Sequence, residues 1–422
     1  MALVTAYDPA AALDHQDGPV RSTHRRDRSP SMTSRTTTRT RVTAASALLA
    51  SSLLLVPLAG TAAAQPAPAT ATTVTAAHTA PRTGAFDPTA LEKALTGIPD
   101  GDVSAALIRV GGKGSWAGTA GVRDLRTGAP ALPHARFRAG STTKVVTAAV
   151  VLQLVAEKRV DLDAPVTRYL PGLFPPSFTK PPTVRHLLTY TSGLRPGASL
   201  GSTTEEMYAH RFETLTPQQV VAASVAQGPA YDPGERQEYG NIHYTVLGLL
   251  IEKVTGDRYA HQAAVRVFRP LGMRHTGFPC GPDPRVHGPH HRAYADIGGR
   301  TTDVTEWNMS DRFAAGDMIS TTADLERLVS GLFGGKVVPR PLLDQMLTVP
   351  RVDGATYGMA LERYVIGGRE IWGKTGSRPG YHTVLAATRD LSRTVVYSVN
   401  AKSAREDGFP LVQRFALPAF ES

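Results

Sequence analysis

STTKVVTAAVVLQLVAEK, residues 141–158, is the stretch from which the architecture of this chain is best predicted. Apolar residues cover nearly every side of a helix drawn over it, so we predict a central, buried helix. Ser141 and Lys144 stand three residues apart at its start. Residues i and i+3 share one helical face, so the lysine amine can reach the serine hydroxyl. The pair predicts a nucleophilic serine activated by a neighbouring base.

This chemistry sets two conditions on the pair. A lysine acts as a base only when its amine is neutral, and burial beside other cations lowers its pKa. A helix N-terminus favours the negative charge that develops during attack. The alternative is that Ser141 only caps the helix and that Lys144 is solvated. The spacing alone does not decide between the two.

Two other serines carry motifs of catalytic type. Ser177-Phe178-Thr179-Lys180 repeats the spacing, but proline pairs flank it and exclude the helix that would align the two side chains. Gly197-Ala198-Ser199-Leu200-Gly201 matches a nucleophile elbow, which needs a strand before it, whereas a loop sequence precedes this one. We expect both to be surface loops.

Two later motifs carry groups that could surround Ser141. Lys374-Thr375-Gly376-Ser377 lies on a predicted strand, where an ammonium and a hydroxyl could hold a carboxylate, and Gly376 allows close approach to the backbone. Tyr239-Gly240-Asn241 precedes a predicted helix. Nearby lysines would lower the pKa of the Tyr239 phenol and let it transfer protons. Taken singly, these motifs also fit a strand edge, a packed tyrosine and a capping asparagine.

The order Ser-x-x-Lys, Tyr-x-Asn, Lys-Thr-Gly resembles that of the penicillin-recognising serine enzymes. Tyr-x-Asn in the middle position is similar to the class C β-lactamases and to the secreted D-Ala-D-Ala carboxypeptidases of actinobacteria. The resemblance runs from Phe86 to the end of the chain and includes residues 183–194, 232–256, 270–273 and 316–325.

The resemblance implies a role for each matching residue. Ser141 would be acylated, and Lys144 and Tyr239 would move protons. The backbone N–H groups of Ser141 and Ser377 would form the oxyanion hole. The implied substrate-binding residues are Asn241, Lys374, Thr375, Gly376 and Arg363. Arg363 is included because it lies near the place where some relatives have an arginine that binds a carboxylate.

The pattern of elements predicts an α+β fold. We expect an antiparallel sheet built from the N- and C-terminal segments and flanked by helices, with an inserted all-helical domain. The sheet part would comprise about residues 86–158 and 310–422, and the helical part about 159–309. Predicted strands are 103–110, 116–124, 370–375, 381–388 and 394–400, with Gly111-Gly112 as a turn; predicted helices are 87–95, 141–158, 184–189, 216–226, 243–254 and 409–420.

The N-terminal region has the layout of an export signal. A basic stretch from Met32 to Arg41 precedes an apolar run, Ala44–Leu58, and small residues up to Ala64. We predict a signal peptide region at 1–64 with the true start at Met32 and cleavage after Ala64, then a linker over 65–85. The apolar run is shorter than the about 20 residues of a membrane span. We therefore expect a secreted, extracellular protein without a stable membrane anchor.

The remaining sequence signals are weak. The basic residues behind the net charge of +10 are scattered, so nucleic acid is not an expected partner. The single cysteine, Cys280, excludes an internal disulfide, and we expect it to be buried. Histidines at 275, 287, 290 and 291 match no closed zinc motif, so neither a metal nor a cofactor is predicted. His243 is expected to face solvent at a helix start.

These observations predict a serine hydrolase that acts through an acyl-enzyme. A D-Ala-D-Ala carboxypeptidase is favoured, with peptidoglycan stem peptides as substrates, a β-lactam as substrate or inhibitor, and a monomeric state. A class C-type β-lactamase, an esterase or a D-amino-acid peptidase on the same scaffold stay open, because the motifs do not distinguish them. A non-catalytic β-lactam-binding module is disfavoured, because the nucleophile and the base are both present.

Overall fold

The computed structural model describes residues 87–403 and 408–421. The chain divides into two units, residues 1–68 and 69–422, and every described residue belongs to the second. The predicted signal peptide and linker therefore lie outside the described residues.

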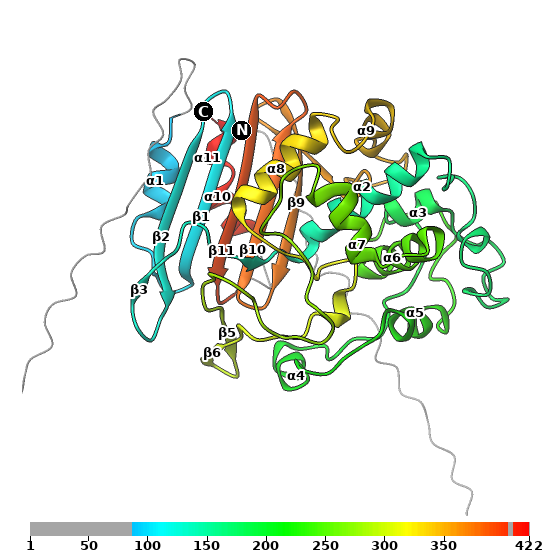
Figure 1. The fold of residues 1–422 in the computed structure, drawn as a ribbon, viewed down its shortest axis with the longest axis horizontal. Helices are drawn as coiled ribbons and strands as arrows, with labels where there is room; N and C mark the ends of the chain where they lie inside the picture. The colour runs from blue at the N-terminus through cyan, green and yellow to red at the C-terminus, as the bar shows by residue number, and fades with distance from the viewer. Residues whose placement is uncertain (1–86, 404–407, 422) are drawn as a thin grey trace, which may run out of the picture. The chain divides into compact units, whose positions relative to one another are not determined.

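Strands from both ends of the second unit form one sheet (Figure 1). Among the described residues it has seven strands, all antiparallel, in the order β3-β2-β1-β11-β10-β9-β8. Strands β1 and β11, far apart in sequence, pair along their length at its centre. The predicted antiparallel sheet of N- and C-terminal segments is thereby confirmed. The bounds are β1 Val103–Gly112, β2 Trp116–Asp124, β3 Ala129–Pro130, β8 Glu362–Ile366, β9 Arg369–Arg378, β10 Tyr381–Thr388 and β11 Arg393–Ala401.

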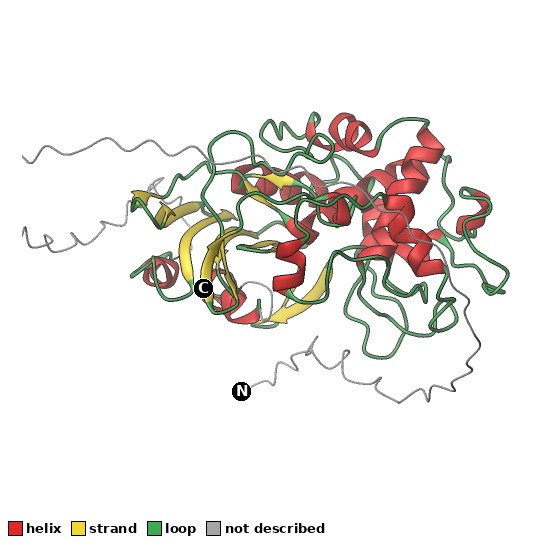
Figure 2. Cartoon of the chain, turned by 90° about the horizontal axis from the view of Figure 1, so that it is seen from below, coloured by secondary structure: helices red, strands yellow, loops and turns green. Residues whose placement is uncertain are grey.

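Most helices lie between β2 and β8 in sequence and gather on one side of the sheet, as Figure 2 shows. Two short strand pairs, β4 (Phe137–Arg138) with β7 (Ile319–Ser320) and β5 (Tyr294–Ile297) with β6 (Arg300–Asp303), link this helical part to the sheet. The helices are α1 Thr89–Leu95, α2 Thr143–Ala156, α3 Val184–Leu188, α4 Thr204–Ala209, α5 Pro217–Val225, α6 Asn241–Thr255, α7 Tyr259–Ala263, α8 Thr322–Phe333, α9 Arg340–Met346, α10 Phe409–Phe415 and α11 Pro418–Glu421.

The sheet separates two hydrophobic cores. On one face α1, α10 and α11 cover alternate strand residues, with Leu91, Val399 and Phe415 fully buried among them. On the other face α8 crosses the strands, and its apolar side joins the larger core around α2 and α6. Because both faces of the sheet are covered, every residue of β10 and β11 is buried.

Helix α2 is the centre of the larger core, as its all-round apolar sequence predicts. It differs from the prediction at its start. Ser141 lies in a 3₁₀ turn, Gly140–Thr142, and the α-helix begins only at Thr143. The tighter turn is compatible with Gly140, which has a φ of +53° that a residue with a side chain rarely adopts.

Other boundaries differ for local reasons. Strand β1 continues through Gly111-Gly112, so the turn falls at residues 113–115. The predicted terminal helix is divided into α10 and α11, because Pro418 cannot continue the hydrogen bonding of the first. Cys280 is exposed rather than buried, because it lies in an irregular loop.

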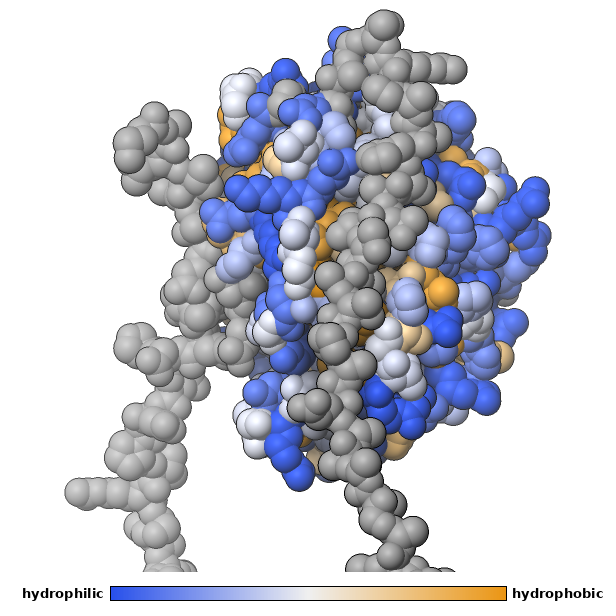
Figure 3. All heavy atoms as spheres, turned by 90° about the vertical axis from the view of Figure 1, so that its left-hand side faces the viewer, coloured by the Kyte–Doolittle hydropathy of each residue, from blue (hydrophilic) through white to orange (hydrophobic). Residues whose placement is uncertain are grey.

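One face of the described residues is largely polar. Figure 3 shows a hydrophilic face with small, scattered hydrophobic patches. In the described part of the chain, no helix has both the length and the apolar character needed to cross a membrane.

Candidate active site

The turn that carries Ser141 is held from several sides. The Ala139 N–H donates to the Met318 carbonyl at 2.8 Å, which ties the turn to the segment before β7. The Thr142 hydroxyl donates to the Ala139 carbonyl at 2.9 Å. The Thr143 hydroxyl donates to the Gly140 carbonyl at 2.7 Å. The backbone around Ser141 is therefore fixed before any substrate binds.

Lys144 is fully buried, and its amine makes three polar contacts. Nζ lies 3.0 Å from Ser141 Oγ, 2.7 Å from Asn241 Oδ1 and 2.7 Å from the Ala315 carbonyl oxygen. A neutral amine has two N–H donors and one lone pair. Asn241 and Ala315 offer only acceptors at these atoms. The lone pair of a neutral Lys144 therefore points at the Ser141 hydroxyl.

The surroundings of Lys144 favour that neutral form. Burial holds the pKa of its amine well below the usual value, and the positive charges of Lys374 and Arg312 lower it further. This meets the condition that the sequence analysis placed on the pair. Lys144 is a buried side chain in contact with the hydroxyl and placed to act as a base, rather than a solvated side chain.

Tyr239 stands between the two lysines. Its ring centroid is 5.0 Å from Lys144 Nζ and 4.7 Å from Lys374 Nζ, and it packs against Tyr190 and Tyr357. Although Tyr239 is 39% exposed, desolvation among the neighbouring rings raises the pKa of its phenol, and a hydrogen bond with Ser141 acts in the other direction. The predicted lowering of this pKa is wrong, because desolvation outweighs the attraction of nearby cations. Tyr239 thus keeps its proton at neutral pH and can donate it.

Strand β9 runs directly against the nucleophile turn. A Cβ on Gly376 would lie 2.2 Å from the Ala139 carbonyl oxygen and 3.1 Å from Ser141 N. A Cβ on Gly140 would lie 2.6 Å from Ser377 N. Only glycines permit this approach. It brings the backbone N–H groups of Ser141 and Ser377 to one place, as an oxyanion hole requires.

Lys374 lies on β9 beside Tyr239 and is 3% exposed. Its amine donates to the Thr375 carbonyl at 2.9 Å and lies 3.5 Å from Thr375 Oγ1. Burial lowers the pKa of Lys374 to about 8, while Glu362 acts in the opposite direction. An ammonium and a hydroxyl are therefore close enough together to bind one carboxylate.

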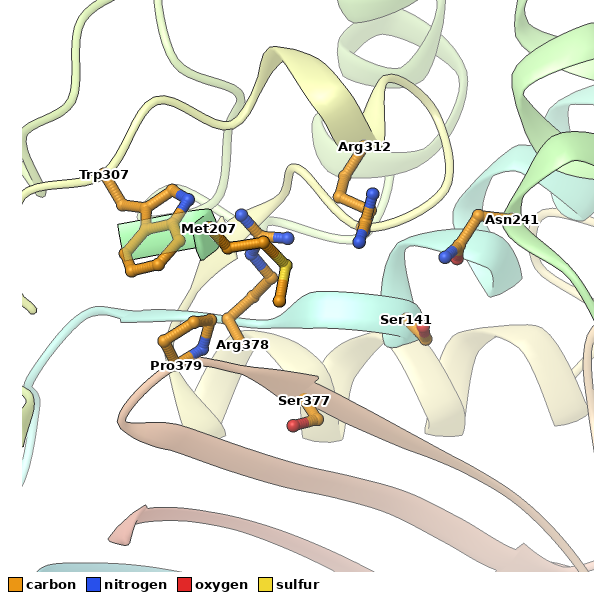
Figure 4. Close-up of a pocket in the computed structure, with 9 residues that line it drawn as sticks. Ser141, Met207, Asn241, Trp307, Arg312, Ser377, Arg378 and Pro379 are labelled. Atoms are coloured by element: carbon orange, nitrogen blue, oxygen red, sulfur yellow. The ribbon is translucent and has the colours of Figure 1, made fainter. Parts of the chain in front are cut away.

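A cavity of about 200 Å³ opens beside Ser141. Figure 4 shows Ser141 and Asn241 at one end of it, and Trp307, Met207, Arg378 and Pro379 at the other. Arg312, Gly316 and Ser377 complete its lining.

Most residues that line this cavity could not be predicted from the sequence. Trp307, Arg312 and Met207 come from irregular segments or a short helix with no readable motif. Arg378 had a signal, because it directly follows Lys374–Ser377 on β9.

Two predicted residues are placed differently from expectation. Arg363 is exposed on the edge strand β8, opposite Trp372, and is not among the residues that line the cavity. His243 is buried rather than facing solvent. Its Nε2 lies 3.1 Å from the Glu238 carbonyl oxygen and its Nδ1 2.8 Å from Ser192 Oγ. These contacts tie the segment that bears Tyr239 to the loop after α3.

The competing motifs stay apart from this site. Ser177 lies in an exposed turn, and Ser199 is exposed with its hydroxyl donating to the Gly201 carbonyl. Within residues 87–403 and 408–421, no group of three or more His, Cys, Asp or Glu side chains is arranged to hold a metal ion. In the histidine-rich loop, His287 pairs with Asp283, and His291 is buried against Asn400.

A serine hydroxyl, a buried amine and converging backbone N–H groups define a serine hydrolase by their chemistry. The sequence model of the Beta-lactamase family matches residues 59–414, so the chain belongs to that family. It is a serine hydrolase of the superfamily of β-lactamases and penicillin-binding proteins.

The names of similar proteins indicate different activities. Esterase EstB of Burkholderia gladioli is 32% identical over 240 residues, which cover 53% of this chain and 57% of the esterase. PbpX of Bacillus subtilis (strain 168), provisionally named a penicillin-binding protein, is 27% identical over 64% of this chain and 63% of its own length. The match thus spans less than two thirds of either relative.

A solved structure matches more completely. The D-stereospecific amidohydrolase from Streptomyces sp. is 31% identical, with a TM-score of 0.66, over 78% of this chain and 99% of that protein.

Proposed function

We propose that this protein hydrolyses the bond after a D-amino acid through an acyl-enzyme on Ser141, and that it is a D-Ala-D-Ala carboxypeptidase that also binds penicillin. The contact of a buried, desolvated Lys144 amine with the Ser141 hydroxyl carries the proposal. The first proton transfer joins atoms that already lie within reach, because Lys144 Nζ is 3.0 Å from Ser141 Oγ.

Neutral Lys144 takes the Ser141 proton as Oγ attacks the carbonyl carbon. The oxyanion accepts hydrogen bonds from the N–H groups of Ser141 and Ser377, each worth about 3–4 kcal/mol in such sites. Tyr239 donates a proton to the leaving amine and regains one from Lys144. Water then attacks the ester, passes its proton through the same groups, and releases the acid and free Ser141.

The assignment to a carboxypeptidase rests on Lys374 and Thr375. A peptide that ends in a free carboxylate would place that group against the Lys374 ammonium and the Thr375 hydroxyl. Asn241 contacts Lys144 at the Ser141 end of the cavity and would hydrogen-bond the amide of the acyl part.

A D-amino-acid amidase or esterase is the second candidate. The Streptomyces amidohydrolase and the esterase EstB favour it, because their names assign them amide or ester substrates. A β-lactamase would use the same groups with faster release of the acyl-enzyme.

Paired assays separate these candidates. We would measure D-alanine release from diacetyl-L-Lys-D-Ala-D-Ala, hydrolysis of D-alanine amide and of its methyl ester, and turnover of a chromogenic cephalosporin. Peptide turnover together with a long-lived penicillin adduct supports the carboxypeptidase. Fast cephalosporin turnover without D-alanine release contradicts it, and cleavage of the amide or ester alone selects the second candidate.

We further propose that the protein is exported as a monomer after cleavage behind Ala64. The order of basic, apolar and small residues before Gln65 supports export. Protein secreted by a bacterial host should begin at Gln65 by N-terminal sequencing. Retention in the cytoplasm with an intact N-terminus would contradict export, and light scattering of the purified protein would test the monomer.

A further inference from the structure

The active-site cavity carries positive charge from its middle to its far end (Figure 4). Of the described residues that line it, two are arginines, Arg312 and Arg378, and none is acidic. Both guanidinium groups contact Asp311, Arg312 at 2.9 Å from Oδ2 and Arg378 at 3.4 Å from Oδ1. One carboxylate is thus divided between two cations, which leaves positive charge at the cavity wall.

Arg378 is held in place yet incompletely satisfied. It is 5% exposed, and its guanidinium carbon lies 5.9 Å from the centre of the Trp307 ring. Its buried Nε has no hydrogen-bond partner among the described residues. Burial lowers the pKa of this guanidinium to about 10, so the group carries its charge at neutral pH. Buried donors of this kind are costly unless a ligand or ordered water pairs with them.

The position of this end relative to Ser141 indicates which half of a substrate enters it. The cavity includes Ser377, Arg378 and Pro379 of β9 and the following turn, but neither Lys374 nor Thr375 lines it. If the leaving group lies over Lys374 and Thr375, as proposed above, the cavity receives the acyl half. Its volume equals that of roughly six or seven water molecules, which suits a short side chain or N-acyl group.

We propose that the cavity selects acyl groups that end in a carboxylate, bound by Arg312 and Arg378 with the methylene groups packed on Trp307 and Met207. The planar fork of a guanidinium matches a carboxylate. This inference rests on the proposed acyl-enzyme at Ser141 and adds the class of acyl group.

The test compares two substrates that differ in one terminal group. N-succinyl-D-alanyl-D-alanine carries a carboxylate where N-succinamoyl-D-alanyl-D-alanine carries a neutral amide of equal size. The wild-type protein should cleave the first with a kcat/KM at least tenfold higher. Arg312→Gln should reduce this ratio to between one and three. Because Arg312 also helps to lower the pKa of Lys144, the variant should lose activity toward both substrates, and the ratio is therefore the readout. Arg312→Lys should give an intermediate ratio.

Controls keep the two proposals distinguishable. Arg126→Gln removes an exposed arginine far from the cavity and should leave the ratio unchanged. If neither peptide is cleaved, the carboxypeptidase assignment fails, and the 4-nitrophenyl esters of the same two N-acyl-D-alanines still report the ratio. A ratio near one in the wild-type protein, or a high ratio that survives Arg312→Gln, overturns the present inference. Arg378→Gln is the less suitable variant, because the buried side chain also supports the fold.

Discussion

Lys144 donates a hydrogen bond to Asn241 across 2.7 Å, and this contact helps to direct the lone pair of the neutral lysine amine toward Ser141. Asn241 is the first residue of α6, whereas Lys144 lies in the first turn of α2. The base is therefore oriented by a neighbouring helix and not only by its own.

Asn241→Asp should disturb the base by charge alone. A carboxylate at the same place would raise the pKa of Lys144, so the amine would lose its proton only at higher pH. The rising limb of kcat/KM against pH should move upward by one unit or more, with activity at pH 7 reduced at least tenfold. Asn241→Ala should lower activity without an upward shift. An unmoved acidic limb in Asn241→Asp would argue that Lys144 is not the base.

The alkaline limb should report on Lys374. Its pKa is lowered to about 8, so the free enzyme loses this positive charge as the pH rises through that value. We expect kcat/KM for substrates with a terminal carboxylate to fall above about pH 8, because kcat/KM follows the ionisation of the free enzyme.

A substrate without the terminal charge provides the control for this limb. The matched methyl ester should show no such fall, because it offers no carboxylate for Lys374 to bind. Lys374→Arg should extend the plateau for the carboxylate substrate to higher pH, because a guanidinium keeps its charge. Equal alkaline limbs for both substrates would contradict carboxylate binding by Lys374.

Penicillin should label Ser141 covalently. Incubation with benzylpenicillin should add the mass of one opened β-lactam per chain, and peptide mapping should place it at Ser141. Ser141→Ala should abolish the adduct. Ser177→Ala and Ser199→Ala serve as matched controls that keep it, because both serines lie in exposed loops away from Lys144. An adduct on either control serine would overturn the assignment of the nucleophile.

Gly376→Ala should separate β9 from the nucleophile turn. The added Cβ would meet backbone atoms, 2.2 Å from the Ala139 carbonyl oxygen, so one of the two segments must shift. Overpacking of this kind typically costs about 1–3 kcal/mol. We expect a lower Tm and at least a hundredfold loss of kcat, since the N–H groups of Ser141 and Ser377 would no longer converge. Gly101→Ala, with open space around it, should change neither.

The chemistry nearest Ser141 could be predicted because its parts lie in short motifs. Ser141 and Lys144 are one helical turn apart, and the glycine before Ser377 explains the close approach of β9. Arg312 and Arg378 could not be predicted as a pair. They meet through Asp311, which precedes Arg378 by 67 residues, and Arg312 lies in a short 3₁₀ turn, Ser310–Arg312.

Burial was the main quantity that local patterns misjudged. His243 reads as a solvent-facing residue at the start of a helix, but its surroundings come from the loop after α3, 51 residues earlier. Local sequence also fails to predict the pKa of the Tyr239 phenol, because that pKa depends on tertiary packing against Tyr190 and Tyr357. Spacing identified the side chains, whereas packing decided their protonation.

Three buried histidines should make the protein sensitive to mild acid. Burial lowers the pKa values of His243, His291 and His382 to about 4, below the ordinary 6.5. The unfolded chain therefore binds more protons than the folded one between pH 6.5 and 4, and stability falls as the pH is lowered through that window. Each histidine contributes about 1.4 kcal/mol per pH unit there. Burial raises the pKa of Asp317 to about 7, so this residue stabilises the folded chain as the pH is lowered. Its effect offsets the effect of one histidine.

Urea unfolding measured at several pH values would check this balance. The free energy of unfolding should fall by roughly 3 kcal/mol per pH unit between pH 6 and 4.5, the net effect of two histidines. His382→Gln should reduce the slope by about half, whatever its effect on stability at pH 7. His210→Gln, at an exposed position, should leave the slope unchanged. Because the slope depends only on proton binding, imidazoles that are protonated in the folded state would leave the effect of Asp317 unopposed. The free energy of unfolding would then rise as the pH is lowered, and that result would contradict the prediction.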